Sequence, residues 1–369
     1  MNRPGPTIED IKREANRRPH DVLRWCGIAE EFGNRSYISM CSPMRKDTRP
    51  SFTIWFKNGT LSFREEDLSA KGDVLDFVAY MNGWFHGPNR GVDKACRFLK
   101  DKLGLDRVDP HKLADDRRAS RKRQAQAQKD SAEKLAKNQL EAFKMFTGAA
   151  PLRDTPGWRY LKEVRGIDLD LLPRGPKGGD LTPGSLRFMP ECWHAEAKRK
   201  LPCIIACCTD LAGDIKAVHR TFIGPNGERV KDLRGWQKDW PARKVWPSFT
   251  GLFIPLWRGG DGMRLKDAIA NGVLETIQMG EGVEKSLAMA LAQPANRTWA
   301  FISLGNLRSI VLPPNCDGVI VQRDNEWKNR QAVESFEIGL RALRDQGVPA
   351  QPVSAFGGKD FDDVLREGL

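Results

Sequence analysis

Short apolar segments alternate with amphipathic ones in the C-terminal part of the chain. Four apolar, strand-like runs occupy residues 273–280, 298–305, 318–324 and 350–356. Two helical patterns occupy residues 282–293 and 329–347. In the longer helical pattern, apolar side chains recur at spacings of three and four, which predicts a buried face formed by Val333, Phe336, Leu340 and Leu343. Strands alternating with helices predict a small parallel sheet in residues 268–369.

The N-terminal part has a different pattern. Residues 1–108 combine short strand patterns with two helical ones and predict a small α+β domain. Residues 109–145 are rich in Lys, Arg, Gln and Ala, and the stretch 111–140 has nine Lys/Arg against four Asp/Glu and no aromatic residue. We expect a solvated helical linker there, with direct DNA binding as the alternative.

Residues 146–267 contain further strand patterns and predict a mixed α/β region. Within 146–262 lie six of the eleven tryptophans and nineteen Lys and Arg. Such interleaving suits a track for single-stranded nucleic acid, because phosphates need cations while bases stack on aromatic faces. Most of these tryptophans are nevertheless expected in the core. The candidate functional cations are Arg220, Arg243 and Lys244.

Charge and composition narrow the function classes. The net charge of +12 and the pI near 9.4 favour a polyanionic partner, nucleic acid before membrane, although a merely soluble basic surface would give the same values. No apolar run is long enough to span a membrane, and the N-terminus lacks a signal-peptide pattern, so a cytoplasmic protein is expected. Cys203, Cys207 and Cys208 fall in an apolar run and are expected to be buried, reduced thiols.

Acidic residues follow several of the predicted C-terminal strands. They are Glu281, Asp324, Glu326, Asp360, Asp362 and Asp363. Residues beyond the carboxyl ends of parallel strands converge on one crevice, where clustered carboxylates repel unless a cation lies between them. Hard oxygen ligands favour Mg²⁺ or Mn²⁺, which serve phosphoryl chemistry. Each acidic residue taken alone is more simply a cap or a loop residue.

Three segments that contain these acidic residues resemble the motifs of the Toprim family in their order and spacing. "GEGVEKSLA" resembles its glutamate motif, "VIVQRDNEWKNRQA" its Asp-x-Asp motif, and "GGKDFDDVL" a turn found in phage- and plasmid-type primases. The resemblance implies a Rossmann-like parallel sheet and catalytic, metal-binding roles for Glu281, Asp324 and Glu326, with Asp360 and Asp362 as further ligands. Glu326 replaces the second Asp of the motif, which alters the geometry of its oxygens.

Two neighbours of these motifs have open roles. Glu284 lies one helical turn beyond Glu281, so it is expected to share its face and support it. Lys359 either contacts a phosphate or is an ordinary loop lysine.

The N-terminal segment "CSPMRKDTRPSFTIWF" and the hairpin after it resemble the zinc-binding domain of bacterial primases. Met44, Glu65 and Leu68 stand where metal ligands are expected, so no zinc is predicted, and Cys41 is expected to be a small buried residue. Packing would replace the metal, through Phe52, Ile54, Trp55, Phe63, Leu75 and Phe77. A basic strip is either a template-reading surface or a solvated charged loop, and comprises Arg45, Lys46, Arg49 and Lys57.

Together these resemblances imply a DNA primase of the phage or plasmid type, which makes short primers from NTPs on single-stranded DNA. No Walker lysine motif occurs in the sequence, so a separate helicase is an expected partner, unless a motor region followed Leu369. The alternatives are a Toprim nuclease and a non-catalytic, primase-like protein that binds single-stranded DNA.

Overall fold

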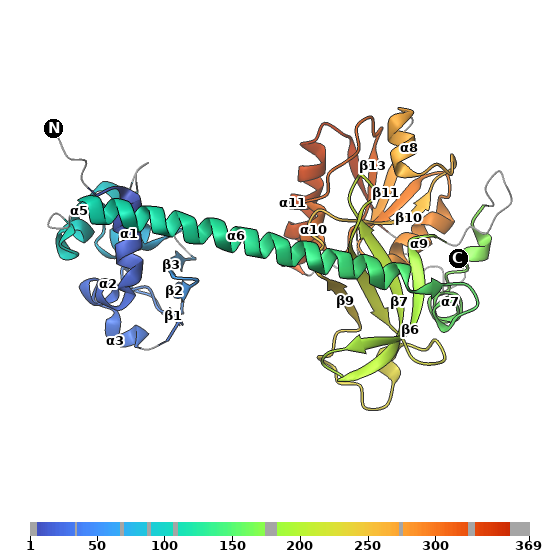
Figure 1. Cartoon of the computed structure of the whole chain (residues 1–369), viewed down its shortest axis with the longest axis horizontal. Helices are drawn as coiled ribbons and strands as arrows, with labels where there is room; N and C mark the ends of the chain where they lie inside the picture. Colours follow the sequence, from blue (N-terminus) through green and yellow to red (C-terminus); the bar gives the residue numbers. More distant parts are fainter. Residues whose placement is uncertain are drawn as a thin grey trace. The chain divides into compact units, whose positions relative to one another are not determined.

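The computed structural model describes residues 6–33, 35–66, 70–86, 90–105, 110–173, 183–272, 276–323 and 329–354. The chain divides into two compact units, Met1–Asp130 and Ser131–Leu369 (Figure 1). The first contains an antiparallel sheet, and the second contains an antiparallel sheet and a mostly parallel one. The expected multidomain α/β and α+β class is confirmed.

The first unit begins with three helices that the sequence analysis did not predict. They are α1 (Ile8–Arg17), α2 (Pro19–Trp25) and α3 (Ala29–Phe32). A capping box starts α1: the backbone N–H of Thr7 donates to the Asp10 carboxylate at 2.8 Å, and Thr7 Oγ accepts from the backbone N–H of Asp10. Ile11, Ala15, Val22 and Leu23 are buried by these helices.

A four-stranded antiparallel sheet follows, in the order β1-β2-β3-β4. Its strands are β1 (Tyr37–Met40), β2 (Phe52–Lys57), β3 (Thr60–Glu65) and β4 (Ala70–Gly72). Asn58 and Gly59 join β2 to β3 with φ values of 54° and 75°, as a tight hairpin turn of two residues requires. Helices α4 (Val74–Met81) and α5 (Val92–Lys102) complete the unit. The predicted core is confirmed except that Trp55 is half-buried.

Cys41 is exposed, so the expectation of a buried residue is wrong. In β1 the alternate residues Tyr37 and Ser39 face solvent while Ile38 is buried, and Cys41 continues the exposed set. Met44 is also exposed, and Leu68 lies outside the described residues.

A cluster of polar side chains surrounds Glu65, which is fully buried. Its Oε1 accepts hydrogen bonds from Ser51 Oγ (2.7 Å) and Arg45 Nη2 (3.4 Å), and its Oε2 accepts one from the Tyr80 hydroxyl (3.1 Å). Burial opposes ionisation of Glu65, but these hydrogen bonds outweigh it and hold the pKa of the carboxyl below its usual value. The cluster links β3 to α4 and to the loop before β2.

Replacing Glu65 by Ala should therefore destabilise the protein by about 2 kcal/mol, because Ser51, Arg45 and Tyr80 would lose a buried acceptor. Glu65→Gln, which keeps one acceptor oxygen, should lose less. Urea unfolding of the full chain measures both variants. An unfolding midpoint of Glu65→Ala equal to that of the wild type would show that the cluster contributes no stability.

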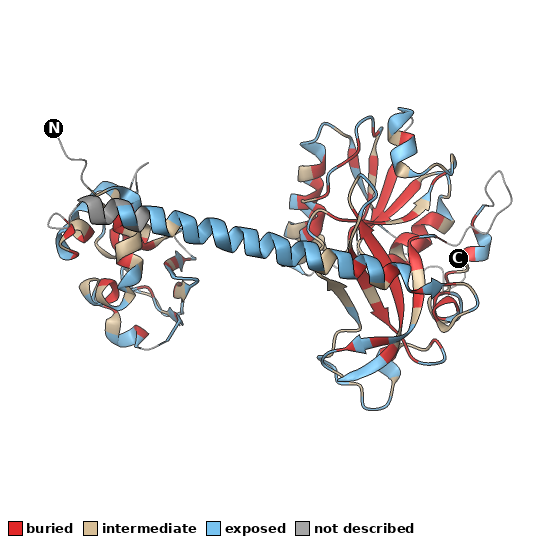
Figure 2. Cartoon of the chain, in the orientation of Figure 1, coloured by how far each residue is buried: buried red, intermediate tan, exposed pale blue. Residues whose placement is uncertain are grey.

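One long helix, α6 (Pro110–Thr147), contains the predicted helical segment. Its charged residues from Arg121 to Glu133 are exposed (Figure 2). Near its C-terminal end, Ala142 and Phe146 are buried against the first sheet of the second unit, together with Cys203, Ile205 and Phe222. The role of a spacer stays a prediction.

The first sheet of the second unit is antiparallel, in the order β5-β6-β7-β8-β9. Its strands are β5 (Ala150–Pro151), β6 (Leu186–His194), β7 (Arg199–Thr209), β8 (Ile215–Phe222) and β9 (Arg243–Trp246). Between them lie the short helices α7 (Pro156–Arg159), η2 (Tyr160–Val164), η3 (Leu169–Leu171) and η4 (Val230–Asp232). Cys203, Cys207 and Cys208 are buried in β7, as predicted.

The second sheet has the order β10-β12-β11-β13-β14. Its strands are β10 (Ile254–Arg258), β11 (Ile277–Gly280), β12 (Arg297–Ala300), β13 (Val319–Arg323) and β14 (Ala350–Ser354). The last four run parallel to one another, which confirms the predicted sheet. β10 pairs antiparallel with β12, although it precedes the predicted boundary at residues 267/268.

Helices cover both faces of this sheet. They are α8 (Leu265–Ala270), α9 (Val283–Ala292), α10 (Leu304–Leu307) and α11 (Arg330–Arg344). Val283 and Leu287 of α9 pack between the two sheets of the unit. On the other face, α11 buries Phe336, Leu340 and Leu343, while Val333 is half-buried, so the predicted helix face is largely confirmed.

Candidate active site at the strand ends

Glu281 follows the last residue of β11, a central strand of the parallel sheet. It is half-buried, and α9 begins two residues later. Gly280 allows this close turn: a Cβ there would lie 2.5 Å from Ser286 Oγ and 2.9 Å from Gln322 Oε1. Ser286 Oγ in turn donates a hydrogen bond to the Gly282 carbonyl at 2.8 Å. The segment therefore holds Glu281 at the carboxyl edge of the sheet.

The neighbouring strands end at the same edge. β13 pairs parallel with β11, with Met279 opposite Val321, and β14 pairs parallel with β13, with Ser354 opposite Arg323. Asp324 is the residue that follows β13 in the chain. The other predicted site residues Asp324, Glu326, Lys359, Asp360, Asp362 and Asp363 lie outside the described residues. Their convergence on Glu281 therefore stays a prediction.

Gln322 is a site residue that the sequence analysis missed. It is the second-last residue of β13, is 3% exposed, and lies beside Gly280. Neither its Nε2 nor its Oε1 has a hydrogen-bond partner in the part of the chain that the structure describes. A buried amide normally has partners, which makes Gln322 unusual among the described residues. Its unusual position, a polar residue inside an apolar strand pattern, was the available signal.

The oxygen donors at this edge fit a hard divalent cation. Glu281 offers a half-buried carboxylate, a ligand of the kind that Mg²⁺ and Mn²⁺ take. Among the described residues alone, no group of three or more His, Cys, Asp or Glu is arranged to hold a metal.

Glu284 forms a buried charge cluster on α9 and is 2% exposed. Its carboxylate forms an ion pair with the Arg243 guanidinium of β9 and accepts a hydrogen bond from the Tyr160 hydroxyl at 3.1 Å. Burial opposes ionisation, but the charges of Arg243 and Arg165 outweigh it and lower the pKa of Glu284 to about 2. The carboxylate thus joins α9 to the antiparallel sheet.

His219 of β8 lies near this cluster and is buried, with no hydrogen-bond partner for its Nδ1 among the described residues. Burial lowers the pKa of His219 to about 4, with Arg243 and Arg220 adding to the effect and Glu284 opposing it.

The cluster makes stability fall on acidification. Folding lowers the pKa of both His219 and Glu284. The stabilisation is therefore complete when the pH is above the ordinary pKa of each group, and it is lost as the pH falls from that value to the folded-state pKa. The loss should run from about pH 6.5 to 4 for His219 and from about 4.5 to 2 for Glu284. The Glu284 step should be worth on the order of 3 kcal/mol. Urea unfolding at several pH values measures it, and Glu284→Gln should lack the lower step. A lower step that persists in Glu284→Gln would contradict the assignment.

The three predicted cations of the antiparallel sheet differ in their partners. Arg243 pairs with Glu284, and Lys244 Nζ lies 2.6 Å from Glu196 Oε2. Arg220 lies on β8, opposite Lys244 of β9. It has no carboxylate within ion-pair distance among the described residues. Arg220 therefore has the least neutralised charge of the three.

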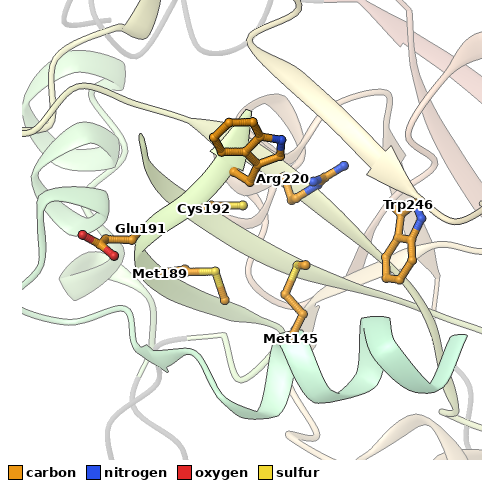
Figure 3. A pocket seen from close by; sticks show the side chains of 7 residues that line it. Met145, Met189, Glu191, Cys192, Arg220 and Trp246 are labelled. Atoms are coloured by element: carbon orange, nitrogen blue, oxygen red, sulfur yellow. The ribbon is translucent and has the colours of Figure 1, made fainter. Parts of the chain in front are cut away.

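The expectation that most of the six tryptophans are core residues is wrong. Only Trp158 is buried, Trp193 is 56% exposed, and the other four are half-buried. Trp193 lies on β6, Trp246 and Trp257 lie on the edge strands β9 and β10, and Trp236 and Trp240 lie in the segment between β8 and β9. Arg220 and Trp246 line a pocket of about 360 Å³ together with Trp193, Met145, Met189, Glu191 and Cys192 (Figure 3).

In the parts of the chain that the structure describes, no helix is long and apolar enough to cross a membrane.

Residues 276–369 match the family model of the Toprim domain, which covers β11 and everything after it. Residues 136–255 match a domain of unknown function (DUF7146). No curated protein matches the chain. The Toprim match agrees with the parallel sheet and with the motif resemblance.

Several solved primase structures have a similar fold. The DnaG primase catalytic domain bound to single-stranded DNA is 14% identical with a TM-score of 0.39, over 64% of this chain and 76% of that one. The E. coli primase catalytic core is 15% identical with a TM-score of 0.38, over 61% and 74%. The primase fragment of the bacteriophage T7 primase-helicase is 14% identical with a TM-score of 0.30, over 46% and 59%.

Proposed function

We propose that this protein is a DNA primase of the phage or plasmid type, a nucleotidyltransferase that builds short primers from NTPs on single-stranded DNA. One observation carries the proposal: Glu281 follows β11 and Asp324 follows β13, which are neighbouring parallel strands in a segment that matches a Toprim domain. Neighbouring strands lie about 5 Å apart, so the two carboxylates would be within reach of one ion.

Oxygen ligands for Mg²⁺ or Mn²⁺ would come from Glu281, Asp324 and Glu326, with Asp360, Asp362 and Asp363 at the rim. When bound, the ion neutralises phosphate charge and activates the attacking hydroxyl. Glu281 would accept the proton of the primer 3′ hydroxyl, and its half-buried position limits its rotamers. The Gln322 amide would orient water or substrate beside it.

The basic residues would hold the polyanionic substrates. Arg220, Arg243 and Lys244 would contact template or triphosphate, and Lys359 a phosphate, although Arg243 and Lys244 would do so while paired with Glu284 and Glu196. The exposed cations Lys46, Arg49 and Lys57 would help to select a start site. A separate helicase would open the duplex.

A single incubation separates this function from its alternatives. The protein is mixed with single-stranded DNA, labelled NTPs and Mg²⁺ or Mn²⁺, beside the variants Glu281→Gln and Asp324→Asn. Short labelled products that both variants fail to make support the proposal. Cleaved template would instead identify a nuclease, and salt-sensitive binding with neither product a non-catalytic binding protein.

A further inference from the structure

We infer that the pocket beside Arg220 and Trp246 receives one unpaired base of single-stranded DNA. The inference deepens the proposed function and rests on it, since it names the part of the template that the antiparallel sheet would hold. The pocket lies within the second unit, in the segment that matches the domain of unknown function. It is lined by side chains of α6, β6, β8 and β9.

Arg220 supplies a cation without a carboxylate partner among the described residues, although it lies beside the Cys192 thiol, whose pKa is lowered to about 7 by a hydrogen bond with Cys203 and by the charge of Arg220. Among the described residues it has no ion pair, its Nε has no hydrogen-bond partner, and its guanidinium lies over the Phe222 ring at 5.9 Å. Figure 3 shows the guanidinium extending toward the side of the pocket where Trp246 lies. The neighbouring cation Lys244, by contrast, is paired with Glu196. A guanidinium without a carboxylate partner in a pocket is able to stack on a base and donate hydrogen bonds to its edge.

Apart from Glu191 and Cys192, the remaining lining is aromatic or apolar, which suits a flat ring. Trp246 is half-buried and Trp193 largely exposed, so both indoles offer a face to a ligand. Met145 and Met189 are flexible apolar side chains that adapt to the shape of a ring. The volume of about 360 Å³ lies in the usual range for small-ligand pockets.

The occupant is a base rather than a phosphate. Glu191, the only acidic residue among those that line the pocket, is paired with Lys200 at 2.9 Å, so the flat aromatic and apolar lining is what favours a base over a phosphate. The net charge of +12 attracts a nucleic-acid strand to the protein as a whole. A strand held by its phosphates on the basic surface would place one base in the pocket.

The pocket and the Glu284 cluster lie on opposite faces of the antiparallel sheet. Arg220 and His219 are consecutive residues of β8, so their side chains point to opposite faces. His219 lies on the face of Glu284 and α9, whereas Val218 and Phe222, which share the parity of Arg220, pack against α6. A base bound in the pocket would therefore lie on the α6 face of the sheet, away from the Glu284 cluster, and its binding needs no metal.

Fluorescence anisotropy in EDTA tests the inference with labelled oligothymidylate. Trp246→Ala and Arg220→Gln should each weaken binding about tenfold, and Trp246→Phe should retain most of it, since phenylalanine still stacks. The control is Arg258→Gln, which removes an exposed arginine of β10 outside the pocket and should have no such effect. Circular dichroism melting shows whether each variant is folded. Consecutive abasic sites in the oligomer should weaken wild-type binding and leave Trp246→Ala unaffected.

Two results would overturn the inference. One is wild-type affinity in folded Trp246→Ala and Arg220→Gln, and the other is full displacement of the oligomer from the pocket by excess free ATP, which would assign the pocket to a nucleotide. If the wild type makes primers but the pocket variants bind DNA normally, only the inference about the pocket is wrong. If the pocket variants lose binding while the wild type makes no primers, the proposed function alone fails.

Discussion

Primer synthesis by Glu281→Gln is expected to be at least about 100-fold slower than by the wild type, because the variant lacks the carboxylate that would take the proton and bind the metal. Glutamine has nearly the same shape, and Glu281 is only half-buried, so the fold should be retained. The measurement is the initial rate of labelled primer formation on single-stranded DNA with Mg²⁺.

The matched control is Glu334→Gln, which makes the same change at an exposed position of α11. It should synthesise primers at the wild-type rate. If Glu281→Gln and Glu334→Gln are equally active, Glu281 has no catalytic role, and the proposed mechanism fails even if the protein is a primase.

Glu284→Ala should lose about 4 kcal/mol of the free energy of unfolding, the second large effect that we expect. The variant would leave Arg243 without its acidic partner and remove the acceptor of the Tyr160 hydroxyl. Urea unfolding followed by tryptophan fluorescence measures the loss. The effect should be on stability, and it should exceed that of Glu65→Ala.

A second substitution separates the charge from the packing. In Glu284→Ala/Arg243→Met the unpaired guanidinium is gone, so the double variant should be more stable than Glu284→Ala alone. If the two losses simply add, the two side chains do not interact energetically, and the cluster is not what joins α9 to the antiparallel sheet.

The sequence predicted the parts of the fold that depend on local pattern. Alternating segments in the last part of the chain correspond to β11 to β14, α9 and α11, because a buried face imposes its period on the residues that form it. The hairpin of β2 and β3 and the buried thiols of β7 follow for the same reason.

Other features depend on contacts that no local pattern records. α1 to α3 are short and polar. Their apolar residues can be recognised as a buried face only when the core that these helices cover is known. The pairing of Arg243 with Glu284 joins a strand of the antiparallel sheet to helix α9, residues far apart in the sequence, so the sequence analysis had considered only functional roles for both. The tryptophans of residues 146–262 were expected in the core because tryptophan is usually buried. Their exposure depends instead on where their strands and loops lie in the fold.

Of the candidate site, the order and spacing of the acidic residues were predictable, and the structure adds the placement of Glu281 and the unexpected Gln322. A polar residue within a strand pattern has no evident partner until its neighbours in space are known, which is why Gln322 was missed.

The central claim is that carboxylates from separate segments after β11 and β13 bind one divalent ion together. Electron paramagnetic resonance of Mn²⁺ titrated into the protein without nucleotide or DNA measures this directly. Bound Mn²⁺ that is lost in both Glu281→Gln and Asp324→Asn, and retained in Glu334→Gln, is the predicted result. Equal binding of Mn²⁺ by the wild type and by these two variants would contradict the claim.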